Sequence, residues 1–260
     1  MAGLLDGKRA LVVGVANKRS IAWSISRAFD AAGATQVLSF QNERVEAGVR
    51  KLGDSLSTAP AGYVPLDVSD DDQLDAAVDA AAGAMGGIDI LVHAVAFANP
   101  DDLGGRYVDT GREGFMLAMD ISAYSLTALT QRVEPHMEAA GGGSIMSLSY
   151  LAAERAVPGY NIMGIAKSAL ESSTRLLAWD LGEKNIRVNA ISAGPVRTLA
   201  AKGVQGFSDM VDVVAEKSPL RRTIAVEEVG DTALYLASPL STAVTGEVIH
   251  VDAGYHAMAT

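Results

Sequence analysis

The chain has 260 residues, 49% of them hydrophobic and 20% charged, which is enough to bury a large core in one domain. A formal net charge of −10 repels a phosphate backbone, so no nucleic-acid partner is expected, and the lack of cysteine excludes disulfides and thiolate chemistry. Four histidines without paired spacing predict no metal site. The apolar runs are too short to cross a bilayer and no secretory signal is visible, so we expect a cytoplasmic protein without a membrane partner.

Short β-branched runs alternate with longer helical patterns along the chain. Strands are expected at residues 9–14, 34–40, 62–66, 88–93, 143–148, 186–191 and 247–251. Helices are expected at residues 21–32, 42–52, 70–84, 112–139, 162–182 and 226–237. Strands that are apolar throughout and separated by helices indicate a parallel sheet covered on both faces. The predicted fold class is α/β, a doubly wound, Rossmann-like parallel sheet of about seven strands flanked by helices, in one dinucleotide-binding catalytic domain over residues 1–260.

The first expected strand leads into a turn that starts at Gly14 and reaches Ser20 at the start of a helix. A dinucleotide site needs such a turn, followed by a helix N-terminus whose free amides meet the pyrophosphate. Gly14 is the one glycine of this turn, so the G-x-G-x-x-G fingerprint is absent. Ser20 is a candidate phosphate contact, and a plain helix cap is the alternative.

The residue after the second expected strand is Gln41, where an acidic residue usually holds the ribose of NAD. A glutamine can bond a ribose hydroxyl without holding a 2′-phosphate, although Arg44 lies three residues further on. We therefore predict NADH rather than NADPH as the cofactor.

Two further strand ends carry candidate cofactor contacts. Asp67 and Val68 follow the third strand, where the Asp67 carboxylate could accept the exocyclic amine of adenine or could instead cap the helix that begins near Ser69. The fourth strand ends in small residues around Val95 that allow close approach of a ribose or nicotinamide. His93, in the same run, is predicted to be structural.

Tyr160 and Lys167 stand seven residues apart at the start of a helical pattern, and Tyr150 precedes Tyr160 by ten. Seven residues make about two helical turns, so ring and ammonium project from nearly the same face. A fixed cation favours phenolate over phenol, which makes the pair a candidate proton-delivery device. On this pair alone, an ordinary amphipathic helix is the alternative.

Taken together, these motifs resemble the bacterial enoyl-acyl-carrier-protein reductases, a divergent branch of the short-chain dehydrogenase/reductase superfamily. The resemblance runs from about residue 6 to residue 255 and rests on Gly14-x5-Ser20-Ile21-Ala22, Gln41-Asn42, His93-x3-Phe97-Ala98, Tyr150-x9-Tyr160-x6-Lys167 and Ala193-Gly-Pro195-Val-Arg-Thr198. In most members of the wider superfamily the lysine follows the tyrosine by four positions. Here that position is Gly164.

The resemblance implies reduction of trans-2-enoyl-acyl-carrier-protein thioesters to saturated acyl thioesters in fatty-acid elongation, with NADH as the reductant. It implies that Tyr160 hydrogen-bonds the enolate oxygen, that Lys167 holds the nicotinamide ribose, and that Tyr150 lines the acyl site. Further cofactor contacts are implied at Ile21, Val196, Arg197, Thr198, Leu199 and Ala200. Further substrate contacts are implied at Ala98, Phe207 and Met210.

The resemblance also implies a homotetramer and an acyl carrier protein as partner. The apolar helical patterns at residues 112–139 and 162–182 favour such an assembly, because helices apolar on more than one side have more than one surface to bury. An acidic carrier needs a basic patch on this acidic chain. The candidates are Arg197, Lys202, Arg221 and Arg222, and pairing of the last two with internal carboxylates is the alternative.

Residues 194–220 follow the sixth strand at the edge of the sheet where ligands bind. So long a segment before the next helix is typical of a substrate-binding lid, and an excursion that packs on a neighbouring subunit is the alternative. Two other functions stay open: a carbonyl or ketoacyl reductase of the same superfamily, and a non-catalytic NADH-binding regulator. The seven-residue spacing argues against the first, because it places the tyrosine roughly 4–5 Å further along the helix than a four-residue spacing would.

Overall fold

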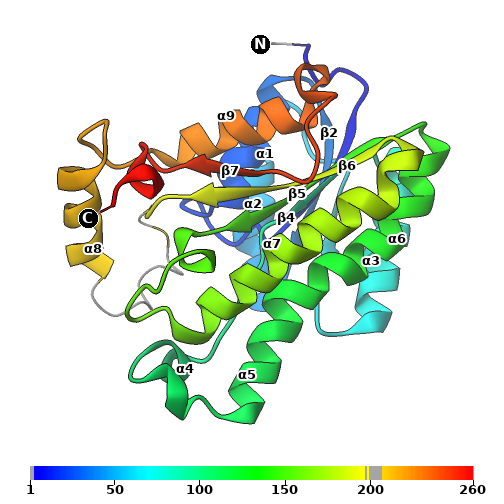
Figure 1. Ribbon diagram of the computed structural model, residues 1–260. Helices are drawn as coiled ribbons and strands as arrows, with labels where there is room; N and C mark the ends of the chain where they lie inside the picture. The colour runs from blue at the N-terminus through cyan, green and yellow to red at the C-terminus, as the bar shows by residue number, and fades with distance from the viewer. Residues whose placement is uncertain (1–2, 197, 199–206, 260) are drawn as a thin grey trace.

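One parallel sheet runs through the centre of the molecule in this computed structural model (Figure 1), which describes residues 3–196, 198 and 207–259. Within that part of the chain the sheet has seven strands in the order β3-β2-β1-β4-β5-β6-β7. Their bounds are β1 Arg9–Val13, β2 Thr35–Phe40, β3 Gly62–Pro65, β4 Ile90–His93, β5 Gly143–Ser149, β6 Ile186–Ala193 and β7 Val248–Val251. The order reverses between β1 and β4, which is the point where sheets of this kind bind ligands.

Helices cover both faces of the sheet, so the predicted doubly wound fold is confirmed. One face packs on α1 (Ile21–Ala31), α2 (Glu43–Gly53) and α9 (Val226–Ala237), and the other on α3 (Asp71–Met85), α6 (Ser125–Ala139) and α7 (Asn161–Leu181). Successive side chains of β1 enter opposite cores, since Ala10 and Val12 belong to the first and Leu11 and Val13 to the second. This double burial explains why apolar residues fill β1 after Arg9 on both faces of the sheet.

The helical run predicted at residues 112–139 has the expected bounds, but it contains a π-helical turn that the pattern did not predict. The structure has α5 (Arg112–Met119), a π-helical turn η2 (Asp120–Tyr124) and then α6. The Ser122 hydroxyl explains the wide turn: it accepts a hydrogen bond from the amide of Phe97 at 2.9 Å and donates one to the carbonyl of Phe97 at 3.0 Å. A π turn of this kind inside a helix is frequent at functional sites.

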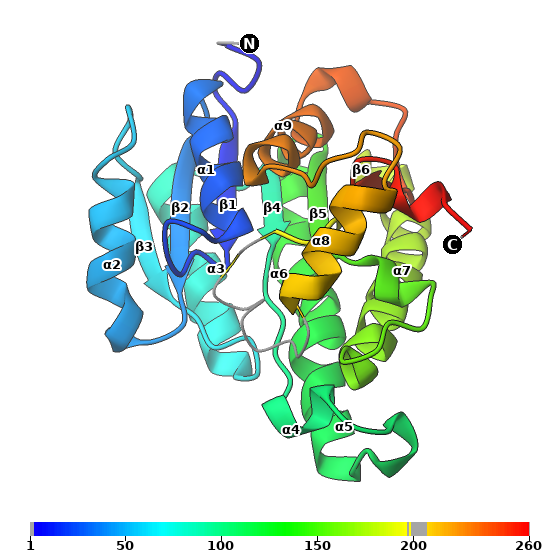
Figure 2. The same cartoon turned by 90° about the vertical axis from the view of Figure 1, so that its left-hand side faces the viewer.

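Two short helices lie beyond the carboxyl edge of the sheet. These are α4 (Pro100–Leu103), which the sequence pattern did not predict, and α8 (Phe207–Lys217), which Figure 2 shows in front of the strand ends. The 3₁₀ turns are η1 Tyr107–Asp109, η3 Leu151–Ala153, η4 Gly182–Lys184, η6 Pro239–Ser241 and η7 Tyr255–Ala257. No helix within residues 3–196, 198 and 207–259 is long and apolar enough to span a bilayer.

Candidate active site

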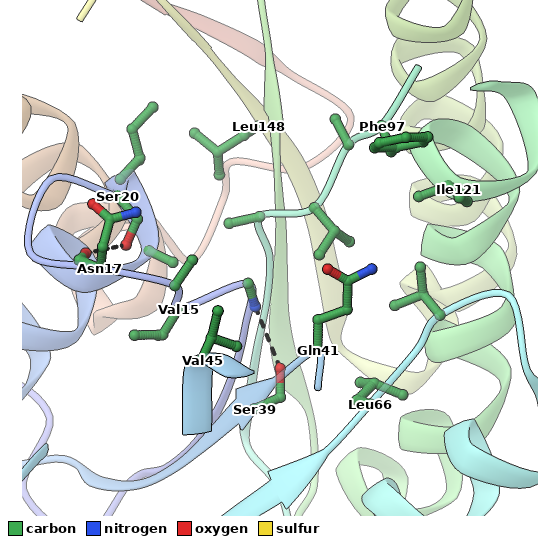
Figure 3. Close-up of a pocket in the computed structure, with 18 of the residues that line it drawn as sticks. Val15, Asn17, Ser20, Ser39, Gln41, Val45, Leu66, Phe97, Ile121 and Leu148 are labelled. Carbon is green, nitrogen blue, oxygen red and sulfur yellow. Dashed lines mark hydrogen bonds between the residues drawn. The ribbon is translucent and has the colours of Figure 1, made fainter. Parts of the chain in front are cut away.

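A cavity of about 500 Å³ opens at the point where the strand order reverses (Figure 3). Its walls come from the segments that follow the first four strands and from the start of α1. Eight residues predicted to bind the cofactor line it: Gly14, Ser20, Ile21, Gln41, Asp67, Val68, Val95 and Thr198. Arg197, Leu199 and Ala200 lie outside the described residues.

Gly14 stands where the chain leaves β1 and passes close to the end of β4. Its φ of +105° falls in the region that favours glycine, and a Cβ there would lie 2.3 Å from the carbonyl oxygen of Ala94. The Gly14 amide donates to the Ser39 hydroxyl at 3.3 Å, which ties this turn to β2 (Figure 3). The single glycine is thus required by the approach of β4 as well as by the turn itself.

Ser20 is the N-cap of α1, as one of its two predicted roles required. Its hydroxyl oxygen accepts from the Trp23 amide at 3.3 Å, and its proton goes to the carbonyl of Asn17 at 2.8 Å. Because this proton is already used, an anion at this helix end would meet the free amides of the first turn, which begins at Ile21. A direct contact between Ser20 and a phosphate stays a prediction.

Asp67 does not cap the helix that follows it, so that alternative was wrong. The N-cap of α3 is Asp70, which accepts from the amide of Gln73 at 3.1 Å. Asp67 instead accepts from the amide and the hydroxyl of Ser69, at 3.0 and 2.7 Å, and this local turn keeps its carboxylate at the wall of the cavity. Its predicted contact with adenine therefore remains a prediction.

Gln41 points its amide into the cavity from the end of β2 (Figure 3). The next residue, Asn42, caps α2 by accepting from the amide of Arg44 at 3.1 Å. Arg44 is thereby placed in the first turn of α2 and is not among the residues that line the cavity.

A second cavity, of about 360 Å³, continues from the first and shares four lining residues with it: Ile21, Ala96, Phe97 and Thr198. The predicted substrate residues Ala98, Tyr150, Tyr160 and Met210 line it, together with Val196, which was predicted to bind the cofactor. Phe207 begins α8, but its side chain lies outside the described part of the structure.

The two tyrosines touch edge to face, with ring centroids 5.0 Å apart and ring planes at 61°. Tyr150 donates its hydroxyl proton to the Met210 sulfur of α8 at 2.9 Å. Tyr160 is the residue just before α7, so it lies at the N-terminal end of that helix. Lys167 lies two turns further on, only 5% exposed, and its Nζ donates to the carbonyl of Leu148 at 2.7 Å.

The chain matches a family model described as enoyl-(acyl carrier protein) reductase over residues 14–256. It is 51% identical over 253 residues to the Bacillus cereus protein named enoyl-(acyl-carrier-protein) reductase (NADH) FabI, covering 97% of this chain and 98% of that relative. The chain belongs to the enoyl-(acyl carrier protein) reductase family.

Solved structures agree with this membership. The crystal structure of the Bacillus cereus enoyl-acyl carrier protein reductase with NADP⁺ and indole naphthyridinone superposes with a TM-score of 0.96 at 50% identity, covering 100% of both chains. The reductase of Anaplasma phagocytophilum in complex with NAD gives a TM-score of 0.95 at 45% identity, covering 100% of this chain and 98% of that one. The Rossmann-like fold predicted for this family member is confirmed.

The phenol of Tyr160 differs from the sequence-based expectation, in which Lys167 favoured its ionised form. Burial raises the pKa of Tyr160 above its ordinary value, and the neighbouring Tyr150 raises it further. Burial also raises the pKa of Tyr150 to about 12, with smaller contributions from Tyr255 and Asp252. Both tyrosines are therefore neutral hydrogen-bond donors at physiological pH.

The ammonium of Lys167 is surrounded by groups that sequence reasoning missed. Burial lowers the pKa of Lys167 to about 8, against the attraction of the Glu171 carboxylate. Glu171 in turn accepts from the Ser149 hydroxyl at 2.5 Å, and burial raises its own pKa. The spacing of four residues between Lys167 and Glu171 on one helix was the available signal.

His93 fits the structural role predicted for it. It is 1% exposed, and its Nε2 lies 2.7 Å from the hydroxyl of Ser125, which gives its own proton to the carbonyl of Ile121. Nε2 is therefore the protonated ring nitrogen. Burial, together with the positive charge of Lys167, lowers the pKa of His93 to about 3, so the ring stays neutral. No group of three or more His, Asp or Glu side chains within the described ranges is arranged to hold a metal ion.

Proposed function

We propose that this protein uses NADH to reduce the carbon–carbon double bond of a trans-2-enoyl thioester carried by acyl carrier protein. The observation that carries this proposal is the continuity of the two cavities. The first has the strand ends and helix N-terminus of a dinucleotide site, and the second is mainly apolar with Tyr160 at its wall. A cofactor in the first and an acyl chain in the second would meet where the lining residues are shared.

The residues of the first cavity fit NADH. The amides at the start of α1 suit the pyrophosphate, and Gln41 suits the hydroxyls of the adenosine ribose. Lys167 is buried and lines neither cavity. Its ammonium has three protons, of which one goes to the Leu148 carbonyl, so donors are left for the nicotinamide ribose. When bound, NADH supplies the hydride that reaches the β-carbon of the enoyl group.

Tyr160 acts on the other end of the reacting system. Hydride addition to the β-carbon places negative charge on the thioester oxygen, and a neutral phenol directed at this oxygen stabilises the charge with a hydrogen bond. Burial keeps the pKa of Tyr160 high, so the phenol is a donor before the hydride arrives. The positive Lys167 adds favourable electrostatics from behind the same wall.

We assign residues 194–220 the role of a lid over the acyl cavity. Helix α8 belongs to this segment, and its Met210 accepts the hydroxyl proton of Tyr150 at 2.9 Å. This contact connects the segment to a residue of the acyl wall, which favours a lid over an excursion toward another subunit. Displacement of Met210 by an acyl chain would free the Tyr150 hydroxyl for a new partner.

The direct test is to mix the purified protein with NADH and crotonyl thioester and to follow the absorbance of the reduced nicotinamide. We expect oxidation of NADH with the enoyl thioester and none with a ketone, which serves as the control for a carbonyl reductase. Binding titrations should give tighter binding of NADH than of NADPH. Tighter binding of NADPH would assign Arg44 to the 2′-phosphate and reject the cofactor choice.

A further inference from the structure

Helix α7 passes close to the 3₁₀ turn η3, and Gly164 makes this approach possible. A Cβ built on residue 164 would lie 2.9 Å from the carbonyl oxygen of Ala152, closer than real Cβ atoms approach other atoms. Because this oxygen belongs to the backbone, it cannot move aside by a side-chain rotation. Gly164 lies in the first turn of α7, where glycine weakens a helix relative to alanine, so the reason for glycine here is space.

Ser168 ties the same two elements together one turn further along α7. Its hydroxyl donates to the carbonyl of Ala153 at 2.6 Å and lies 3.1 Å from the carbonyl of Gly164. The turn η3 is thus held by a hydrogen bond to Ala153 and seated against the helix at Ala152. Both contacts depend on α7 having a small residue at position 164.

Tyr150 is the residue just before η3, so a displacement of that turn would displace its ring as well. The ring stands 5.0 Å from that of Tyr160, centroid to centroid, and both line the acyl cavity. We infer that Gly164 and Ser168 are positioning residues that set the separation of Tyr150 from Tyr160 and with it the width of the acyl cavity. The inference rests on the proposed enoyl reduction only for its effect on rate.

The first test is structural and independent of activity. In a crystal structure of Gly164→Ala we expect η3 to move away from α7 and the centroid separation of the two rings to exceed 5.0 Å. Gly83→Ala is the matched control, because Gly83 lies exposed in α3 and a Cβ there meets nothing within 4 Å. A ring separation that is the same in Gly164→Ala and in the wild type would overturn the inference.

The second test is a double-mutant cycle with the enoyl thioester. Gly164→Ala should lower kcat/KM by about tenfold, since misplacement by a fraction of an ångström at a reacting site costs on this order, while the Kd for NADH stays within about twofold. In a Tyr150→Ala background the same substitution should change kcat/KM by less than about twofold, because the ring through which it acts is gone. Additive losses would indicate a general structural role and reject the inference.

Ser168→Ala tests the same positioning role if Gly164→Ala fails to fold. It removes one hydroxyl and should lower kcat/KM in the same direction by a smaller factor, again only while the Tyr150 ring is present. Ser57→Ala, at an exposed serine distant in sequence from Ser168, should leave kcat/KM unchanged. A wild-type protein inactive on the enoyl thioester would reject the proposed function, while the ring separations in Gly164→Ala would still decide the positioning role.

Discussion

At the scale of single residues, Tyr160 and Tyr150 carry the same side chain but have different partners. Tyr150 donates to Met210, whereas Tyr160 is the tyrosine that the family resemblance assigns to the enolate oxygen. Tyr160→Phe removes the hydroxyl and keeps the ring, so NADH should still bind. Loss of one hydrogen bond to developing charge should lower kcat roughly a hundredfold to a thousandfold, as measured with crotonyl thioester.

Tyr150→Phe is the control for this substitution. It removes the bond to Met210 but leaves the ring contact with Tyr160, so we expect a milder loss of kcat. If Tyr150→Phe abolished turnover and Tyr160→Phe kept it, the roles of the two tyrosines would have to be exchanged.

Lys167 gives the site a pH dependence whose sign follows from burial. Because the pKa of Lys167 is lowered from 10.5 to about 8, the free protein loses this positive charge as the pH rises through about 8. The affinity for NADH and kcat/KM should therefore fall above that pH, and Lys167→Ala should weaken both at every pH. The folded chain binds fewer protons than the unfolded chain between these two pKa values, so this group makes stability rise with pH there.

The measurement is a pH series of NADH titrations and of kcat/KM, which reports ionisations of the free protein. The matched variant is Lys167→Met, which keeps most of the side-chain length. It should flatten the alkaline limb of the NADH titration. An unchanged limb in Lys167→Met would assign the ionisation to another group.

At the scale of elements, the π turn between α5 and α6 holds the segment after β4 through Ser122. Ser122 is fully buried although Phe97 is exposed, and Ser122→Ala leaves the amide and the carbonyl of Phe97 without this partner in a partly buried contact. Unsatisfied buried groups cost about 1–3 kcal/mol each, so the free energy of unfolding in urea should fall by that order. Because Phe97 lines both cavities, KM for the enoyl thioester should rise as well. An unfolding curve unchanged from that of the wild type would contradict this account.

The apolar pattern of the chain predicted every strand of the sheet to within two residues, because strands covered on both faces are built mainly from apolar residues. The pattern gave the bounds of the helical run at residues 112–139 but not the π turn within it. Only the long-range contact of Ser122 with Phe97 distinguishes this turn from a straight helix. The short helix α4 was not predicted either, because four residues are too few to show a helical periodicity.

Within the site, the sequence predicted the local roles of residues but not the contacts between segments that are distant along the chain. The sequence pointed to Gly14, but not to the approach of Ala94 that forbids a side chain there. It placed Asp67 at the cavity but missed Asp70, three residues on, as the cap of α3. It noted Gly164 only as a missing lysine, whereas the structure shows a close contact with the backbone of Ala152.

At the scale of the whole molecule, the proposed carrier-docking patch is narrower than the sequence indicated. Arg222 forms a bidentate ion pair with the Glu228 carboxylate, with hydrogen bonds of 2.7 and 2.8 Å, so the pairing alternative is confirmed for this residue. Arg221 is exposed and donates to the backbone carbonyl of Glu216. Because a carbonyl is uncharged, this contact does not neutralise the positive charge of Arg221. Arg197 and Lys202 lie outside the described residues.

Charge reversal therefore tests Arg221 and Lys202 rather than Arg222. Arg221→Glu and Lys202→Glu should raise KM for a carrier-bound enoyl substrate, with a larger effect at low salt, and should spare crotonyl thioester. Lys51→Glu, an exposed residue on α2, is the control of equal charge change. Equal effects of Arg221→Glu on both substrates would reject docking at this patch.

The assembly proposed from the family resemblance is a homotetramer, and the surface of α7 supports it. Ile165, Leu176 and Trp179 are 38%, 64% and 84% exposed and form one stripe on that helix. Light scattering at micromolar concentration should give a mass of about 108 kDa, four times the 27.0 kDa chain. Burying a tryptophan removes roughly 150–250 Å² from water, worth about 4–6 kcal/mol per copy before association costs, so Trp179→Lys should lower this mass. Ala80→Lys, at an exposed position of α3, should leave the mass unchanged. A monomeric mass for the wild type would reject the assembly, and an unchanged mass for Trp179→Lys would move the interface away from α7.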